Sequence, residues 1–197
     1  MGRGEGRFLG ARKRARQLNA TVGDELHETS AAVRHITHPP WWRGARGEWY
    51  VVAQLVLIAG VILGPRTLPG LPLWPAALAR ISMAAGAALM VAGGCLLFAG
   101  VFRLGANLTS LPYPKAHASL VQSGPYGLVR HPIYAAVILL AYGWAFAVRG
   151  WLTLVYAAAL LIFLDFKAAR EEQWLTDKYP EYPDYQRRVR KLIPFIY

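Results

Sequence analysis

Four runs of hydrophobic residues, separated by short polar or proline-containing segments, dominate the pattern along the chain. They cover residues 49–64, 77–102, 133–148 and 151–166. Apolar runs without central acidic residues are typical of helices that cross a bilayer, because each Asp at a bilayer centre costs roughly 2.5–3.5 kcal/mol. No strand leads into a glycine-rich phosphate loop, as a Rossmann fold would require. The pattern therefore predicts an all-α integral membrane protein, non-Rossmann, with four or five transmembrane helices.

The connections between these runs are of two kinds. Pro65 and the three prolines within residues 68–75 cannot continue a helix, so a turn follows the first run. Only Arg149 and Gly150 separate the last two runs, which predicts a tight helical hairpin whose second helix continues out of the membrane beyond Glu172. The second run is rich in Ala and Gly, which let membrane helices approach closely. We therefore expect it at the centre of the bundle.

Basic residues divide the chain between the two sides of the membrane. Residues 1–48, 103–131 and 167–197 carry 19 of the 22 Lys and Arg residues. Cytoplasmic loops of membrane proteins carry an excess of these residues. We therefore expect a multi-pass protein of the cell or inner membrane with both termini in the cytoplasm. The predicted parts are a basic N-terminal extension up to residue 48, a transmembrane hairpin over 49–102, and a C-terminal core over 103–197 that ends in a C-terminal cap at the cytosolic face.

Composition excludes several classes of function. The chain is 55% hydrophobic and only 17% charged, whereas about a quarter of the residues of a soluble domain are charged. The basic residues responsible for the net charge of +11 cluster at the ends of the apolar runs. The expected partner is therefore the lipid bilayer, and no nucleic acid is expected. Cys95 is the only cysteine, and His27, His35 and His38 lack the further ligands of a typical zinc site, so no metal is expected. No pattern specifies an oligomeric state.

Two polar segments stand out beside the apolar runs. In the first, residues 123–134, Pro132 suits the first turn of a helix. Arg130 and His131 then lie beside free N–H groups at a helix start, which attracts carboxylates or phosphates. The second segment, Arg-Glu-Glu at 170–172, lies just past the fourth run, so the hairpin should bring the two segments together at the inner leaflet. Lipid head-group binding and ordinary ion pairs are the simpler interpretations of these charges.

The order and spacing of these elements resemble a known family. Residues 103–197 contain, in this order, Gly-Pro-Tyr-x-x-Val-Arg-His-Pro-x-Tyr, an apolar hairpin, Glu-Glu, Tyr-x-x-Tyr-x-x-x-Val and Ile-Pro-Phe-Ile. This set resembles the isoprenylcysteine carboxyl methyltransferase family, whose C-terminal core is shared by phospholipid N-methyltransferases. The resemblance implies a membrane-embedded enzyme that binds S-adenosylmethionine at the cytosolic face.

The resemblance also implies which residues form the site. S-adenosylmethionine carries a sulfonium, an amine and a carboxylate, so its pocket needs both signs of charge and aromatic surface. Catalytic roles fall to His131, Arg170 and Glu171. The residues expected to bind the cofactor are Tyr126, Val129, Arg130, His131, Pro132, Tyr134, Glu171, Glu172, Tyr182 and Tyr185.

The expected methyl acceptor is a lipid or another lipophilic small molecule that enters from between the helices. A carboxylate acceptor would need only a nearby cation such as Arg170 or Lys167, whereas an amine or thiol would need a base such as His131 or a glutamate. Two other functions stay open, an NADPH-dependent membrane reductase resembling sterol reductases and a non-enzymatic membrane protein of the same fold. The paired glutamates favour an amine-bearing ligand over a 2′-phosphate, so methyl transfer is the preferred interpretation.

Overall fold

The computed structural model of the chain describes residues 47–71, 74–109, 118–194, 196 and 197. Within these residues the regular structure is helical, and β-type pairing is limited to an isolated bridge between Val129 and Arg190. This agrees with the predicted all-α, non-Rossmann fold. The basic extension predicted over 1–48 lies outside the described residues except at its last two positions. The elements are α2 Glu48–Leu63, α3 Ala76–Leu104, the 3₁₀ turn η2 Gly105–Asn107, α4 Pro125–Leu128, α5 Pro132–Val148, α6 Trp151–Lys178 and α7 Tyr182–Arg188.

Proline and glycine set the ends of the long helices. α2 ends at Leu63 and is followed by Gly64 and Pro65, and α5 begins with Pro132 at its first position. α5 closes on Arg149, which adopts the left-handed conformation with φ 53°, and α6 starts directly after Gly150. The predicted tight hairpin between the last two long helices is therefore confirmed. α6 has 28 residues, or ~42 Å at 1.5 Å per residue, so it continues well beyond its apolar part.

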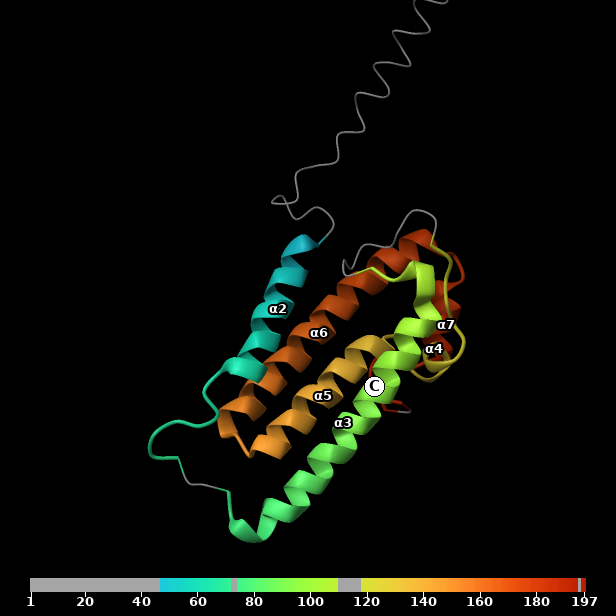
Figure 1. Cartoon of the computed structure of the whole chain (residues 1–197). Coiled ribbons are helices and arrows are strands. Elements are labelled where there is room, and N and C mark those ends of the chain that lie inside the picture. Colours follow the sequence, from blue (N-terminus) through green and yellow to red (C-terminus); the bar gives the residue numbers. More distant parts are fainter. Residues whose placement is uncertain (1–46, 72–73, 110–117, 195) are drawn as a thin grey trace, which may run out of the picture. The chain divides into compact units, whose positions relative to one another are not determined.

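The long helices pack around α5, which contacts α2, α3, α4 and α6 (Figure 1). In the described part of the chain α3 contacts α5 along its length but neither α2 nor α6. The expectation that this helix lies at the centre of the bundle is therefore wrong. Its buried residues, Ser82, Gly86, Gly93 and Gly100, form one stripe, and the other small residues face outwards. A β-carbon on Gly86 would lie 2.7 Å from the carbonyl oxygen of Gly143, so glycine is required for this approach.

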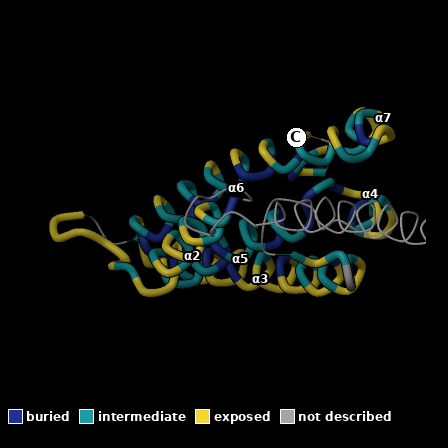
Figure 2. The backbone as a smooth tube through the Cα atoms, turned by 90° about the horizontal axis from the view of Figure 1, so that it is seen from above, coloured by how far each residue is buried: buried dark blue, intermediate teal, exposed yellow. Residues whose placement is uncertain are grey.

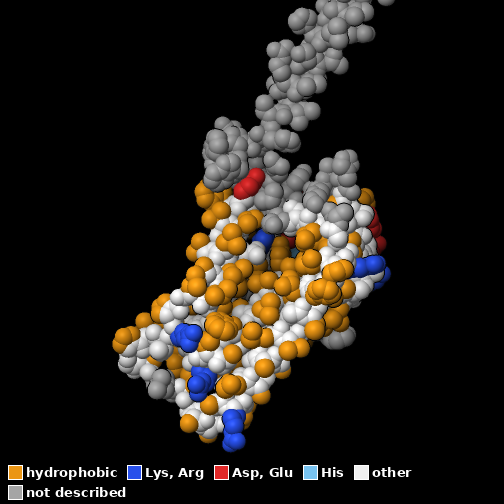
Figure 3. Space-filling model, in the orientation of Figure 1, with side chains coloured by type: hydrophobic (Ala, Val, Ile, Leu, Met, Phe, Trp, Pro, Cys, Tyr) orange, Lys and Arg blue, Asp and Glu red, His pale blue; other side chains and the backbone are white. Residues whose placement is uncertain are grey.

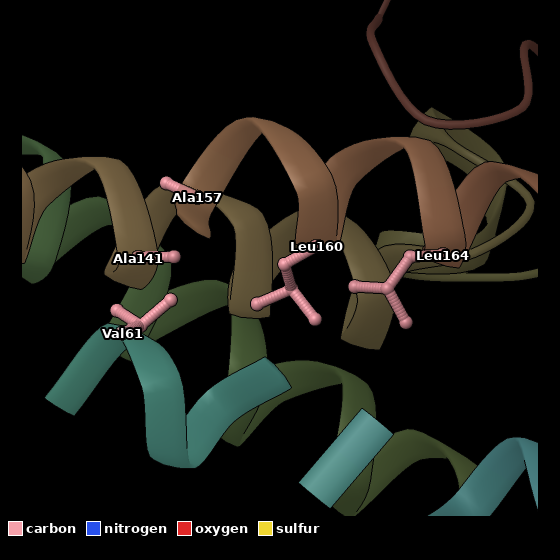
Figure 4. Packing of buried hydrophobic residues seen from close by; sticks show 5 residues of the cluster. All are labelled: Val61, Ala141, Ala157, Leu160 and Leu164. Atoms are coloured by element: carbon pink, nitrogen blue, oxygen red, sulfur yellow. The ribbon is translucent and has the colours of Figure 1, made fainter. Parts of the chain in front are cut away.

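A small apolar core joins α2, α5 and α6. Val61, Ala141, Ala157, Leu160 and Leu164 form this core and point towards one another (Figure 4). Buried positions follow the faces that the helices turn towards each other, and exposed positions follow their outer faces (Figure 2). The core therefore fixes α2 against the α5–α6 hairpin.

The outer faces of the helices are strongly apolar. Phe98, Phe102 and Phe166 are 66–72% exposed, and hydrophobic side chains are spread over the whole face seen in Figure 3, with few charged groups among them. α3 and α6 are long and apolar enough to cross a membrane, which is fewer helices than the four predicted. α2 and α5 have 16 and 17 residues, or ~24–26 Å, against a hydrocarbon core of ~30 Å. They are shorter because a glycine ends α2 and a left-handed residue ends α5.

Candidate functional site

A cavity of about 310 Å³ lies where α5 begins. Its walls come from segments far apart in the sequence: α2, the end of α3 with η2, residues 118–121, α4, the first turn of α5, the polar half of α6, and α7. One part of the wall is aromatic and polar, with Tyr126, Tyr179, Tyr182 and Tyr185. Another part carries Val51, Gln54, Leu55 and Lys167. The cavity thus offers an aromatic region and a region bordered by the apolar helices.

Glu172 joins the segment that enters α5 to the segment that leaves α6. Its Oε1 atom lies 2.7 Å from Nε of Arg130 and 3.0 Å from Nε2 of His131. Its Oε2 atom accepts a hydrogen bond from the amide of Gln186 in α7 at 3.1 Å. The predicted meeting of these two segments is therefore confirmed. Because both oxygens of Glu172 already have protein partners and the carboxylate does not line the cavity, its position is that of a buried connector.

Glu171 is placed differently from its neighbour. It lines the cavity, its side chain is 24% exposed, and its Oε2 atom accepts a hydrogen bond from the Tyr134 hydroxyl at 2.7 Å. Nδ1 of His131 lies 3.8 Å from the same oxygen, and the His131 ring stacks on the Tyr134 ring with centroids 5.3 Å apart. Glu171 is therefore the member of the acidic pair whose carboxylate is accessible to a ligand.

The residues around Arg130 attach the C-terminal segment to the start of α5. The guanidinium donates to the carbonyl oxygens of Gln186 and Val189. The backbone N–H groups of Arg130 and His131 donate to the carbonyl oxygens of Arg190 and Lys191 at 2.8 and 3.1 Å. These contacts hold α7 and the residues after it as a cap over the end of the bundle.

Two other predicted residues belong to the wall of this junction. Val129 is fully buried in the bridge to the C-terminal segment and does not line the cavity. Pro132 is also buried, but it does line the cavity at the first position of α5. The structure therefore places Pro132 in the wall of the cavity and Val129 behind that wall.

Three buried tyrosines bring their rings to the cavity. The Tyr185 hydroxyl donates to the carbonyl oxygen of Tyr126 at 2.5 Å, and the Tyr182 and Tyr185 rings meet edge to face at 5.7 Å. Burial, reinforced by the negative charge of Glu171, raises the pKa of Tyr126 well above its usual value. Burial also raises the pKa values of Tyr182 and Tyr185. All three hydroxyls therefore stay neutral near pH 7, and their rings offer uncharged aromatic surface.

Of the two cations of α6 that were candidates for the site, Lys167 lines the cavity and Arg170 does not. Arg170 is exposed, donates to the Gln173 side chain at 2.7 Å, lies 4.9 Å from the Trp174 ring, and does not line the cavity. Lys167 does line it, and its Nζ atom donates to Oε1 of Gln54 at 2.6 Å. Gln54 was missed from the sequence, although an amide in the otherwise apolar run 49–64 is a usable signal.

The part of the chain that the structure describes has no cluster of metal ligands. Among the residues that the structure describes, no group of three His, Cys, Asp or Glu side chains could hold a metal ion. His27, His35 and His38 lie outside the described residues. The ionisable side chains that line the cavity are those of one carboxylate, Glu171, several tyrosines, His131, Arg130 and Lys167.

The chain is similar in sequence to known proteins. Residues 81–182 match the model of the phospholipid methyltransferase family. A stretch of 81 residues is 31% identical to the cobalt-zinc-cadmium resistance protein CzcN of Cupriavidus metallidurans. This stretch covers 41% of this chain and 38% of the length of that protein. The family match includes α5, α6 and most of α3, and it ends within the first turn of α7.

Proposed function

Because the chain belongs to the phospholipid methyltransferase family, we propose that it is a methyltransferase that uses S-adenosylmethionine and acts on a lipophilic acceptor at the cytosolic face of the membrane. The family and the two long apolar helices together indicate a membrane protein with methyltransferase activity on lipid-like molecules. The methyl donor, the site residues and the topology are the parts that the proposal adds.

The observation that carries the proposal is the composition of the cavity wall. It combines an accessible carboxylate, Glu171, with the rings of Tyr126, Tyr182 and Tyr185. A volume of about 310 Å³ falls within the roughly 300–1,000 Å³ of small-molecule sites. A ligand with an amine and a sulfonium fits such a wall, because the carboxylate pairs with the amine and the neutral rings attract the sulfonium.

The remaining charge of the methyl donor is its carboxylate. Arg130 is already engaged by Glu172 and two carbonyl oxygens. The start of α5 is the better partner, since the N–H groups of Ile133 and Tyr134 precede the first intrahelical bond and both residues line the cavity. We therefore assign the amine to Glu171 and the carboxylate to the first turn of α5.

When bound, S-adenosylmethionine supplies a methyl carbon to the attacking atom, and the electrons of the broken carbon–sulfur bond stay on the sulfur. The protein contributes mainly by holding the reactants in line. The two ring nitrogens of His131 face Glu171 and Glu172. An acceptor that must lose a proton would lose it to this cluster of His131 and the two glutamates. Lys167 replaces Arg170 as the cation beside the acceptor, because only Lys167 lines the cavity.

The topology proposed from the basic residues completes this picture. All four long helices cross the bilayer, and α4, α7 and the start of α5 lie on the cytoplasmic side. The short helices α2 and α5 span by local thinning of the bilayer and by extension of the side chains at their ends. The methyl donor then enters from the cytosol and the acceptor from the membrane.

Calorimetric titration of the detergent-purified protein with S-adenosylhomocysteine and with NADPH tests the proposal. We expect S-adenosylhomocysteine to bind and NADPH not to bind. Glu171→Gln should weaken binding of S-adenosylhomocysteine by roughly tenfold to a hundredfold, the usual effect of losing a charged hydrogen bond. Glu181→Gln, at an exposed position before α7, is the matched control and should bind normally. Binding of NADPH alone would support the reductase, and binding of neither would support a non-enzymatic protein.

A further inference from the structure

Asp165 is an acidic residue in the apolar part of α6. It lies 14 residues beyond Trp151, the first residue of the helix, or ~21 Å along the helix axis at 1.5 Å per residue. A hydrocarbon core is ~30 Å thick, so in the proposed topology Asp165 lies at or inside the inner edge of the hydrocarbon. An ionised carboxylate is costly at this depth unless a partner neutralises it. Asp165 therefore needs a cation that reaches the same depth.

Lys191, which follows α7, is this cation. Its Nζ atom lies 2.6 Å from Oδ1 of Asp165, and the two side chains are only 12% and 29% exposed. The Tyr197 hydroxyl donates to the same oxygen at 3.1 Å, and the Lys191 ammonium lies 5.4 Å from the centre of the Tyr197 ring. The two charges are thus neutralised against the side of α6, with an aromatic ring beside them.

Residues 192–194, 196 and 197 form a turn, called the C-terminal turn below. The N–H groups of Leu192 and Ile193 donate to the carbonyl oxygen of Tyr197 at 2.8 and 2.7 Å. The N–H groups of Ile196 and Tyr197 donate to the carbonyl oxygen of Ile193 at 3.2 and 3.1 Å. Irregular backbone enters a bilayer at high cost unless the protein itself bonds its polar groups, because no water is present there. The C-terminal turn bonds these groups internally.

The outer side chains of the C-terminal turn are apolar. Ile193 is 46% exposed and Ile196 is 75% exposed. On α6, Phe166 follows Asp165 and is 67% exposed, and Ile162, one helical turn earlier, is 55% exposed. Large apolar side chains that gather on a surface mark a contact with another apolar phase or molecule. The paired charges of Asp165 and its lysine partner therefore lie within an apolar surface.

We propose that the C-terminal turn inserts into the cytosolic leaflet of the bilayer beside α6, and that Asp165 permits this by neutralising Lys191. The partner of this surface is lipid. The carbonyl oxygens of Arg190 and Lys191 accept hydrogen bonds from the N–H groups of Arg130 and His131, so the inserted turn also anchors the cap to the membrane. The inference goes beyond methyl transfer and depends only on α6 spanning the bilayer.

Spin labels measure the depth of the C-terminal turn in nanodiscs of phosphatidylcholine and phosphatidylglycerol. Cys95 is the only cysteine of the chain, so Cys95→Ser provides a background in which Ile196→Cys carries a single nitroxide. Oxygen is enriched in hydrocarbon and a nickel chelate in water, so the ratio of their collision rates with the label reports its depth. Val91→Cys on the exposed face of α3 is the lipid reference, and Arg187→Cys on the exposed face of α7 is the water reference.

We expect the ratio at Ile196 to be close to the lipid reference and well above the water reference. Asp165→Asn leaves Lys191 without a counter-ion, so the ratio should fall towards the water reference. Adding Lys191→Met to Asp165→Asn should restore the high ratio, because a buried ion pair can be replaced by neutral groups at little cost, whereas removal of one partner is destabilising. Asp177→Asn, at an exposed position near the end of α6, is the matched control and should leave the ratio unchanged.

A ratio at Ile196 equal to the water reference, with Asp165 in place, would overturn the proposal, because the turn would then lie in the cytosol. Low collision rates with both reagents would also overturn it, since protein, such as a second copy of the chain, would then cover the turn. An unchanged ratio in folded Asp165→Asn, or a low ratio in the double variant, would refute the role of Asp165 as counter-ion. The double variant keeps the test decisive if Asp165→Asn alone does not fold.

Failure of the proposed function is recognised separately. The depth of the label does not depend on S-adenosylhomocysteine or on any acceptor. If S-adenosylhomocysteine does not bind but the ratio at Ile196 is high and sensitive to Asp165→Asn, the membrane contact stands and methyl transfer does not.

Discussion

Replacement of Glu172 by Gln tests whether this carboxylate holds the cap on the bundle. The substitution keeps the shape of the side chain but removes the negative charge opposite Arg130 and His131, 2.7 and 3.0 Å away. Removing one partner of a buried ion pair typically costs 3–5 kcal/mol. Because the side chains of Glu172 and Arg130 are each 11% exposed, and because the amide can keep one hydrogen bond, we expect ~2–4 kcal/mol here.

This loss should appear as local opening of the cap. The N–H groups of Arg130 and His131 are bonded to the C-terminal segment, so they exchange with solvent when the cap lifts. A loss of 2–4 kcal/mol corresponds to exchange that is roughly thirtyfold to nearly a thousandfold faster. Hydrogen exchange followed by mass spectrometry should show this in peptides covering residues 126–131 and 186–192.

Peptides from α3 and from the middle of α5 provide the internal control, because they have no contact with Glu172. Glu181→Gln provides the external control, since it removes a carboxylate from an exposed position beside the same cap. Unchanged exchange in residues 126–131 of the Glu172→Gln protein would refute the reasoning, since the cap would then be held by its backbone contacts alone. Equal acceleration in α3 would also refute it, because the change would be global.

Two further predictions concern helix packing and the tyrosines. Gly86→Ala should lower the thermal unfolding temperature in detergent by an amount equivalent to ~1–3 kcal/mol, because its β-carbon would lie 2.7 Å from a backbone oxygen of α5; Gly94→Ala on the same helix meets no atom within 4 Å and should be neutral or slightly stabilising. Burial raises the pKa values of Tyr126, Tyr182 and Tyr185, so the folded state binds more protons than the unfolded state above pH ~10 and loses stability as the pH rises further. Alkaline titration of phenolate absorbance should therefore show these groups ionising together with unfolding, and their gradual ionisation in a protein that is still folded would contradict the assignment.

Helix ends were predictable because local residues determine them. Pro65, Pro132 and the Arg149–Gly150 pair act through the backbone of their own segment, so no knowledge of the fold was needed. The meeting of Arg130 with Glu172 was predictable for a related reason. A two-residue connection forces α5 and α6 to run side by side, which leaves their polar ends adjacent.

The arrangement of the helices around α5 was not predictable in the same way. In a membrane helix every face is apolar, so the hydrophobic pattern does not say which face is buried. The Ala and Gly residues of α3 occur on several faces, and only the stripe through Gly86 and Gly93 meets α5. The position of α3 at the edge therefore depends on contacts that only the three-dimensional structure reveals.

The motif residues of the candidate site were predictable, but the contact between α2 and α6 in its wall was not. The motif residues located Glu171 and Tyr134, whereas the contact between Gln54 and Lys167 joins residues 113 positions apart. A single sequence has no signal for such a pair beyond the presence of one amide in an apolar run. The same limit explains why Arg170 was chosen over Lys167, since both are basic residues of one helix and differ only in the face they occupy.

The separation of α2 from α3 bears on how the affinity for the proposed lipophilic acceptor should be measured. In the described part of the chain these helices do not touch, and residues of both line an apolar cavity, which in the proposed topology lies at the depth of the lipid chains. A molecule that arrives by this route is sampled from the two-dimensional solution formed by the bilayer or micelle. Saturation should therefore follow the mole fraction of the acceptor among the surrounding amphiphiles, and adding empty detergent at a fixed acceptor concentration should slow the reaction by dilution.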